Sequence, residues 1–597
     1  MTKNKTASTK DSTAKGAKNN PVGMPENGPS HAPWLKFYDP GVPANIQPIP
    51  APIYYWLDQA AQKRPEATAI SFKSYKINYR QLRLAAEILA ANLHRHGVGK
   101  GDRVAVMMPN LPQTIMAFWG IVKAGATAVM TNPLYMGHEL LYQLNDAEAK
   151  ILLTTDTCWG KISELRRELC VKKYFITSPS DPLRLPADPL WRFRKRGGCA
   201  QVAEIDYKTV WPFADLFRGN RRLSHPIEHP EKDLAILQYT GGTTGIPKGA
   251  MLTHLNLMSN VQQLYEILRP ILDKPQRFLG VLPFFHVYAL NICVILPSAS
   301  QAAVYCTPMF NPVETMQIIE RQKITIFPGA PAVYIALLQH KEIKHYDFSS
   351  LLLCLSGSAP MPVEYIRLFS EKTRCTILEG YGLTEASPVT NINPLFGTRK
   401  PGTVGMPLPG TEARIVDMEL GSIPMPANHV GELIIKGPQV MPGYWKQPDE
   451  TANMLRNGWL YTGDIASMDE QGYVTIVDRK KDLVLTGGYN VYPREVDEVL
   501  HTHPKIKEAV SAGIPHGIRG EILKAYVVLK DGEQATPTEI MAFCRGKLAN
   551  YKIPKQVEIR NDLPKNLVGK ILRRALRAEE EQRRKETEAS GAAKRRL

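Results

Sequence analysis

A glycine- and threonine-rich stretch, Tyr239-Thr-Gly-Gly-Thr-Thr-Gly-Ile-Pro-Lys-Gly249, has the composition of a phosphate-binding loop. Glycines allow a backbone to turn sharply and to direct its N–H groups at an anion. The threonine hydroxyls add donors, and Lys248 adds a positive charge. The stretch follows the strand-like run Leu234–Gln238. We therefore predict a triphosphate cradle formed by Thr240, Gly241, Gly242, Thr243, Thr244, Gly245 and Lys248.

This loop differs from the common P-loop, in which a Gly-Lys pair is followed by serine or threonine and a helix begins at the lysine. Here Ile246 and Pro247 separate Gly245 from Lys248. The Gly-Lys pairs elsewhere in the chain are followed by glycine, isoleucine or leucine, and these offer no hydroxyl to magnesium. The P-loop ATPase class is thereby excluded. A flexible surface turn is the alternative interpretation of the stretch.

Two further loops follow strand-like runs and carry side chains suited to a nucleotide. In Ser356-Gly-Ser-Ala-Pro360, a flat base could pack against the backbone of Gly357, Ser358 and Ala359. In Glu379-Gly-Tyr-Gly-Leu-Thr-Glu385, the ring of Tyr381 could stack on adenine. Other residues of the same loop could bind a phosphate and a metal ion.

Within that second loop, Gly380 and Gly382 flank Tyr381, and Thr384 could donate to a phosphate. Glu385 could hold magnesium, which prefers oxygen ligands. Taken alone, Tyr381 would be a core residue and Glu385 a surface carboxylate. The surrounding motifs favour the nucleotide-binding roles.

These segments, in this order, resemble the motifs of the acyl-adenylate-forming enzymes, the superfamily of acyl-CoA synthetases, luciferases and peptide-synthetase adenylation domains. The resemblance extends from about Pro33 to Arg577. It is closest to bacterial long-chain fatty-acid–CoA ligases, through Gln238–Gly245, Pro438–Trp445 and Gly488–Pro493.

The resemblance implies an α/β fold. Its large N-terminal domain would contain two doubly wound α/β subdomains and a β-rich subdomain, followed by a small mobile α+β C-terminal domain. The expected boundaries are 1–47 for a mostly disordered segment, 48–480 for the AMP-binding domain, 481–577 for the mobile domain and 578–597 for a charged tail.

The same resemblance assigns roles to residues beyond the glycine-rich loop. Asp464, which ends Asn457-Gly-Trp-Leu-Tyr-Thr-Gly-Asp464, would accept hydrogen bonds from both ribose hydroxyls, with Arg479 beside it. Lys481 falls at the hinge between the domains. Lys570, which ends the loop Leu563–Lys570, would contact the carboxylate and the α-phosphate during adenylation.

On the acyl and thiol sides, the resemblance places His286 between the carboxylate and the thiol tunnel, and Gly487 and Gly488 near CoA. Leu290 stands where some relatives have a tryptophan gate, which puts a gated acyl tunnel in question. The implied catalytic residues are Lys570, Thr240, Glu385 and His286, with Glu385 as the metal ligand.

The implied activity is an ATP- and Mg²⁺-dependent ligation of a fatty acid to CoA through an acyl-AMP intermediate. An aryl- or medium-chain-acid CoA ligase would use the same motifs. A membrane-associated fatty-acid-binding or uptake protein with a vestigial site is a third interpretation, against which the complete set of charged site residues argues. The sequence leaves the oligomeric state open, with a homodimer as one option.

Composition and charge bear on nucleic-acid binding, on membrane contact and on the compartment of the protein. The formal net charge of +17 lies partly in the tails and in Leu190–Arg196, and no nucleic-acid-binding motif accompanies it. That basic and aromatic segment suits an anionic membrane surface, although a solvated loop would have the same composition. The eight cysteines contain no C-x-x-C pair, which favours reduced thiols in the cytoplasm. No apolar run is long enough for a membrane span.

The elements expected to position these residues alternate between helices and short strands, which favours parallel α/β sheets. Helices are predicted over 81–96, 111–125 and 538–548, and strands over 104–108, 151–155, 324–327, 351–355, 376–379, 508–514, 524–530 and 556–559. Ligands of such sheets lie beyond the carboxyl ends of the strands, where the motifs fall.

Overall fold

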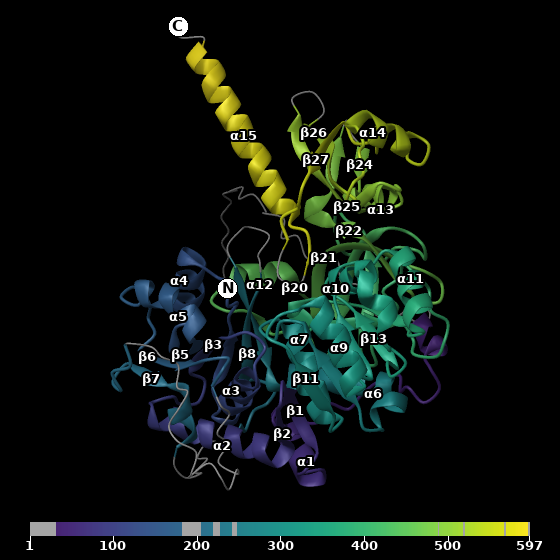
Figure 1. Cartoon of the computed structure of the whole chain (residues 1–597). Coiled ribbons are helices and arrows are strands. Elements are labelled where there is room, and N and C mark those ends of the chain that lie inside the picture. Colours follow the sequence, from purple (N-terminus) through teal and green to yellow (C-terminus); the bar gives the residue numbers. More distant parts are fainter. Residues whose placement is uncertain are drawn as a thin grey trace, which may run out of the picture.

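The computed structural model describes residues 32–181, 204–218, 227–240, 247–486, 489–516, 520–565 and 569–594. Figure 1 shows a large body with a smaller unit beside it, and the C-terminal helix α15 extending away from both. The predicted α/β fold with a large N-terminal and a small C-terminal part is confirmed.

The first α/β sheet has the strand order β19-β9-β8-β4-β3-β5-β6-β7. Strands β3 to β8 are parallel to one another, whereas β9 pairs antiparallel with both β8 and β19. Its strands are β3 (Arg103–Met107), β4 (Thr127–Met130), β5 (Ala149–Thr155), β6 (Lys173–Thr177), β7 (Val210–Pro212), β8 (Leu234–Thr240), β9 (Lys248–Thr253) and β19 (Gly443–Tyr444). The helices in this part of the chain are α2 (Tyr79–Arg95), α3 (Pro112–Lys123), α4 (Gly137–Asp146), α5 (Asp156–Leu165), η2 (Phe213–Phe217) and α6 (His254–Leu272).

The second sheet has the order β16-β15-β14-β13-β12-β10-β11-β1-β2, with parallel strands from β14 to β1. Its strands are β1 (Thr68–Phe72), β2 (Tyr75–Asn78), β10 (Arg277–Gly280), β11 (Ala303–Cys306), β12 (Ile326–Gly329), β13 (Leu353–Ser356), β14 (Ile377–Gly382), β15 (Val389–Ile392) and β16 (Met406–Pro407). The accompanying helices are α1 (Tyr55–Lys63), α7 (Val287–Leu290), the π-helical turn η3 (Asn291–Ile295), α8 (Leu296–Ala299), α9 (Pro312–Gln322), α10 (Pro331–Gln339), η4 (Lys341–His345), α11 (Val363–Thr373) and η5 (Thr384–Ala386).

An antiparallel sheet completes the large body, as the β-rich pattern predicts. It contains β17 (Glu412–Val416), β18 (Gly431–Lys436), β20 (Leu455–Arg456), β21 (Trp459–Met468) and β22 (Val474–Arg479), and it is accompanied by helix α12 (Pro448–Met454).

The small C-terminal unit begins with η6 (Lys480–Asp482). It is built from β23 (Val484–Thr486), β24 (Tyr489–Val491), α13 (Pro493–His501), β25 (Ile506–His516), β26 (Gly520–Leu529), α14 (Pro537–Arg545), β27 (Gln556–Arg560) and α15 (Arg573–Lys594). The unit has an apolar cluster of its own between its sheet and helices, so it can move as one body.

Local sequence explains why the central helices form. Helix α2 begins with a capping box in which Asn78 accepts from the Gln81 backbone N–H and the Gln81 side chain accepts in return. Helix α2 packs closely on α3 at Gly120, where a Cβ would lie 2.4 Å from Leu89 Cδ2. A larger residue at position 120 would force the two helices apart.

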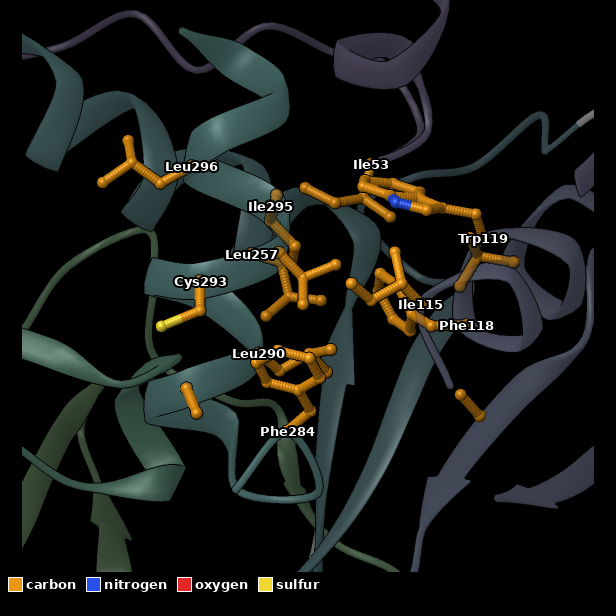
Figure 2. Close-up of a cluster of buried hydrophobic side chains, with 14 of the residues drawn as sticks. Ile53, Ile115, Phe118, Trp119, Leu257, Phe284, Leu290, Cys293, Ile295 and Leu296 are labelled. Atoms are coloured by element: carbon orange, nitrogen blue, oxygen red, sulfur yellow. The ribbon is translucent and has the colours of Figure 1, made fainter. Parts of the chain in front are cut away.

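The main apolar core lies between the two α/β sheets. Figure 2 shows Phe118 and Trp119 of α3, Leu257 of α6 and Ile295 of η3 contributing to it. Burying each such side chain stabilises the fold by about 1.5–3 kcal/mol. This core holds the two sheets in a fixed relation and therefore fixes the strand ends that carry the site.

Residues 32–47 differ from the prediction that residues 1–47 are mostly disordered. They contain a 3-10 turn, η1 (Pro33–Phe37), and Trp34 is 2% exposed. The carboxylate of Asp39 accepts from the backbone N–H groups of Leu395 and Gly397, each at 2.6 Å. These contacts hold the segment on the large body.

In the part of the chain that the structure describes, no helix combines the length and hydropathy of a bilayer span. Segment 190–196, with its predicted affinity for an anionic membrane, lies outside the described residues.

Candidate active site

The predicted phosphate loop connects two antiparallel strands. Thr240 ends β8 and pairs in register with Lys248, the first residue of β9. No helix begins at this lysine, in agreement with the exclusion of a P-loop. Residues Gly241, Gly242, Thr243, Thr244 and Gly245 lie outside the described residues, so their assigned role stays a prediction.

Lys248 is buried and forms an ion pair with Glu450 of α12. Its ammonium also lies 5.6 Å from the ring centroid of Tyr444. The Tyr444 hydroxyl donates to Glu385 Oε1 at 2.7 Å, and burial together with the Glu385 charge raises the pKa of that phenol. These contacts join the phosphate-loop lysine to the predicted metal ligand through one tyrosine.

The sequence did not assign roles to Tyr444 and Glu450. Tyr444 lies in Pro438–Trp445, a segment that resembles bacterial long-chain fatty-acid–CoA ligases but implies no role for this tyrosine. Glu450 lies 202 residues after Lys248 and became its partner through the packing of α12 near β19. No local pattern would have identified that pair.

Glycines at the ends of β13 and β14 allow close backbone approach. A Cβ on Gly382 would lie 1.9 Å from the Pro388 carbonyl oxygen, and one on Gly357 would lie 3.1 Å from Tyr288 Cζ. Ser358 has a φ of 71° in the loop after β13. The two strands are parallel neighbours, so the loops that contain Gly357, Ser358, Ala359, Gly380 and Thr384 meet at one edge of the sheet.

Asp464 is the centre of the predicted ribose site. It pairs in register with Arg479 across β21 and β22, and Arg479 Nε lies 3.3 Å from Asp464 Oδ1. The Tyr381 hydroxyl donates to Asp464 Oδ2 at 2.5 Å. Both carboxylate oxygens therefore have a polar partner in this arrangement. The predicted stacking of the Tyr381 ring on adenine stays a prediction, whereas the structure places the Tyr381 hydroxyl on the carboxylate that is predicted to bind ribose.

Lys570 enters this site from the small C-terminal unit. The positive charge of Arg479, with burial as a second cause, lowers the pKa of Lys570 to about 7, although Asp464 opposes the shift. Beside it, Gly569 has a φ of 78°, and a Cβ there would lie 2.3 Å from the Ala332 Cβ of α10. The lysine loop thus contacts the large body at Ala332, and Lys570 lies within electrostatic range of the predicted ribose residues.

His286 directly precedes α7 without a side-chain capping hydrogen bond, and its ring centroid lies 4.7 Å from that of Phe285. Burial lowers the pKa of His286 to about 4, so the imidazole is neutral at neutral pH. Tyr288, two residues further on, packs against Gly357 and thereby places α7 next to the predicted adenine loop. The predicted role of His286 on the acyl side rests on this location and on the resemblance.

Lys481 lies in η6 between the two bodies, where the hinge was predicted. Burial and the charge of Arg479 lower the pKa of Lys481. Gly487 and Gly488, the predicted CoA-side glycines, lie outside the described residues.

Glu385 fits the chemistry of a magnesium ligand. Within the described ranges, no group of three or more His, Cys, Asp or Glu side chains could form a protein-only metal cage. Magnesium in phosphoryl-transfer sites typically takes only one or two carboxylates, with substrate phosphates and water supplying the rest. A single carboxylate near the phosphate-loop lysine matches that pattern.

A proton-uptake measurement tests the position of Lys570. Its pKa of about 7 leaves the ammonium mostly deprotonated at about pH 8, and bound phosphates would raise that pKa. We therefore expect ATP binding at about pH 8 to take up close to one proton, and this uptake to fall as the pH drops below about 7. Calorimetry in buffers of different ionisation enthalpy gives the proton count.

The matched variant for this measurement is Lys570→Met, which keeps the length of the side chain but removes the titrating group. It should bind ATP without the uptake. If both proteins take up the same number of protons, a group other than Lys570 is the one that is protonated when ATP binds.

Comparisons with known proteins show the family and the fold of the chain. A model of the AMP-binding enzyme family matches residues 57–445, and a model of the AMP-binding enzyme C-terminal domain matches residues 495–570. A long-chain-fatty-acid–CoA ligase of Bacillus subtilis (strain 168) is 46% identical over 557 residues, covering 92% of this chain and 98% of that protein.

A long-chain-fatty-acid–CoA ligase of Escherichia coli O157:H7 is 37% identical over 553 residues, with 92% of this chain and 98% of that protein covered. Among solved structures, ATP-bound MatB from Rhodopseudomonas palustris superimposes with a TM-score of 0.77 at 31% identity, covering 88% of this chain and 98% of that one.

Proposed function

The chain belongs to the AMP-binding enzyme family, and from this premise we propose that it is a long-chain fatty-acid–CoA ligase. ATP and CoA are its co-substrates. The observation that supports the mechanism best is the approach of Lys570, from the small unit, to Asp464 and Arg479 of the large one. Such an arrangement suits the closing of a charged side chain over a bound nucleotide.

In the first half-reaction, a carboxylate oxygen of the fatty acid attacks the α-phosphorus of ATP. The bond to the bridging oxygen breaks, giving acyl-AMP and pyrophosphate. Two oxyanions approach each other in this step, so alignment and charge neutralisation are the main contributions of the protein. Lys570 holds the carboxylate against the α-phosphate, and Lys248 holds the departing phosphates.

The nucleotide is held by the residues already placed. Asp464 and Arg479 bind the ribose, the loops that contain Gly357 and Tyr381 bind adenine, and Glu385 holds Mg²⁺. When bound, Mg²⁺ neutralises the charge of the phosphates. The Lys248–Glu450 ion pair opens when ATP binds, because the Lys248 ammonium then pairs with the phosphates, which carry more negative charge than the Glu450 carboxylate.

In the second half-reaction, the thiol of CoA gives its proton to bulk water and its sulphur attacks the acyl carbon. A carbon–sulphur bond forms, the bond between the acyl carbon and the phosphate oxygen breaks, and AMP leaves with that oxygen. We propose that the small unit pivots at Lys481, withdraws Lys570 and brings Gly487 and Gly488 to the thiol entry. A few backbone dihedrals at a hinge can accommodate such a change. Because burial lowers its pKa to about 4, His286 remains neutral on the acyl side at neutral pH.

The proposals of a cytoplasmic location and of peripheral contact with an anionic membrane through Leu190–Arg196 rest on composition. Vesicle co-sedimentation with anionic and neutral lipids would test the second of them.

A panel of acids tests the substrate class. Each additional buried CH₂ contributes about 0.8 kcal/mol, roughly a fourfold gain in kcat/KM. We expect pyrophosphate exchange to be more than about tenfold more efficient with palmitate than with octanoate or benzoate. Greater efficiency with benzoate or octanoate would favour the aryl- or medium-chain alternative. Binding of palmitate without AMP release in the presence of ATP and CoA would favour the uptake protein.

A further inference from the structure

Asp478, the penultimate residue of β22, is a buried carboxylate close to the pivot. Its side chain is 1% exposed and lies three residues before Lys481. Oδ1 accepts from the Arg479 backbone N–H at 2.7 Å, and Oδ2 accepts from the Arg494 backbone N–H at 2.8 Å. Arg573 Nη1 lies 3.5 Å from Oδ1. Two of these three partners belong to the small unit.

Arg573 is oriented by the small unit itself. Its Nη2 donates to Asp497 Oδ2 at 2.5 Å, and its Nε donates to the Ser511 carbonyl at 3.0 Å. Nη1 also lies 3.7 Å from Asp482 Oδ2. These partners move with Arg573 when the small unit moves. They fix the planar guanidinium so that its remaining edge faces Asp478.

Arg573 is also close to Lys570 in the chain. It is the first residue of α15 and follows Lys570 by three residues. The position of the guanidinium therefore restrains the position of the lysine loop, which also contacts Ala332 of the large body through Gly569.

Contacts that join residues before and after Lys481 are the ones that a rotation must break. Asp478 precedes the pivot, and its partners Arg494 and Arg573 follow it. The guanidinium of Arg494 likewise donates to the Ile476 carbonyl on the large-body side. Withdrawal of Lys570 by rotation at Lys481 separates these atoms, whereas the contacts of Arg573 with Asp497 and Ser511 survive it.

We propose that Asp478 and Arg573 are positioning residues that hold the small unit in the acyl-AMP-forming arrangement, and that their ion pair opens before CoA reacts. This inference rests on the proposed two-step function. It predicts that weakening the pair lowers only the first half-reaction, because an ion pair present in one of two arrangements shifts their populations by its own contribution.

The test variant is Asp478→Asn, which keeps the shape of the side chain and removes its charge. Acyl-AMP formation, followed by pyrophosphate exchange, should fall about 5- to 50-fold. Thioester formation from supplied palmitoyl-AMP should stay within about twofold of the parent rate or rise. An equal loss in both half-reactions, or no loss in either, would overturn the proposal.

A matched control is Glu495→Gln, also a carboxylate-to-amide change. Glu495 lies on α13, and its partner Lys552, at 2.7 Å, belongs to the same unit, so this pair does not cross the pivot. Both half-reactions of this variant should stay within about twofold of the parent. A half-reaction split in the control as large as that of Asp478→Asn would overturn the assignment.

Hydrogen–deuterium exchange of the ligand-free full chain tests the ion pair without any chemistry. Residues 482–497 and 569–577 should exchange faster in Asp478→Asn than in the parent or in Glu495→Gln. Unchanged exchange would refute the pair as a restraint. If the parent protein forms no acyl-AMP, the proposed function fails, and the exchange result still decides whether the pair restrains the small unit.

A second variant covers the case in which Asp478→Asn does not fold. Arg573→Lys retains the charge that Asp497 requires but loses the planar fork that reaches Asp478. Arg573→Lys should likewise lower acyl-AMP formation and leave thioester formation near the parent rate. If Arg573→Lys changes both half-reactions by the same factor relative to the parent, the proposal is overturned.

Discussion

Replacing Lys570 with alanine is expected to lower acyl-AMP formation by about 10²–10³-fold, the usual effect of removing one charged contact with a transition state. Thioester formation from supplied acyl-AMP should be largely spared. The reason is that Lys570 belongs to the small unit and reaches the site only in the arrangement seen here, next to Arg479 and Asp464. Pyrophosphate exchange and single-turnover thioester formation measure the two steps separately.

Lys565 provides the matched control for Lys570→Ala. It lies in the same loop, but its ammonium pairs with Glu508 and Asp562 of the same unit, at 2.7 and 3.0 Å. Lys565→Ala should change both half-reactions equally and by a small factor. If Lys570→Ala lowers both half-reactions by the same factor, the small unit does not alternate between two arrangements.

Replacing Asp464 with alanine is expected to weaken ATP binding by about 10- to 100-fold, because each hydrogen bond to a charged group contributes about 1.5–3 kcal/mol. The carboxylate is buried, with the Tyr381 hydroxyl 2.5 Å from one oxygen and Arg479 Nε 3.3 Å from the other, so both oxygens are accessible to polar partners. Calorimetric titration with ATP gives the affinity. An affinity equal to that of the parent would refute the ribose assignment.

A ligand series separates loss of ribose contacts from general damage to the site. The parent should bind ATP more tightly than 2′,3′-dideoxy-ATP, and Asp464→Ala should bind the two equally, as a double-mutant cycle requires for a direct contact. Affinity for tripolyphosphate should be unchanged, because Lys248 and the phosphate loop bind it. Equal loss for all three ligands would indicate that the whole site has been disturbed.

Much of the fold followed from local patterns. Asn78 and Gln81 form the capping box that starts α2, and Gly97 follows that helix with a φ of 89°. The strands that lead into Thr240 and Ser356 lie where apolar runs indicated, with ends shifted by one or two residues. Asp464 and Arg479 are close in the chain, so an antiparallel pairing of β21 with β22 was enough to bring them together.

Residues 32–47 show an ordered part of the N-terminal segment that composition does not reveal. Its proline, glycine and polar residues favoured disorder for residues 1–47. Asp39 nevertheless finds backbone N–H donors at Leu395 and Gly397, and Trp34 packs against Gly472. A segment of low intrinsic order becomes ordered when a distant part of the fold offers a preformed site, which no local pattern can reveal.

By itself the sequence determined which chemical groups this protein carries and, through its resemblance to a family, predicted their roles: a glycine–threonine loop for phosphate, a carboxylate for ribose, and a lysine near the C-terminus for the reacting carboxylate. Only the tertiary structure decided their partners, because those partners are distant in the chain. Tyr381 meets Asp464 across 83 residues, and Lys248 meets Glu450 across 202. The packing of sheets and helices brings such groups together, and it is not encoded in the spacing of any one motif.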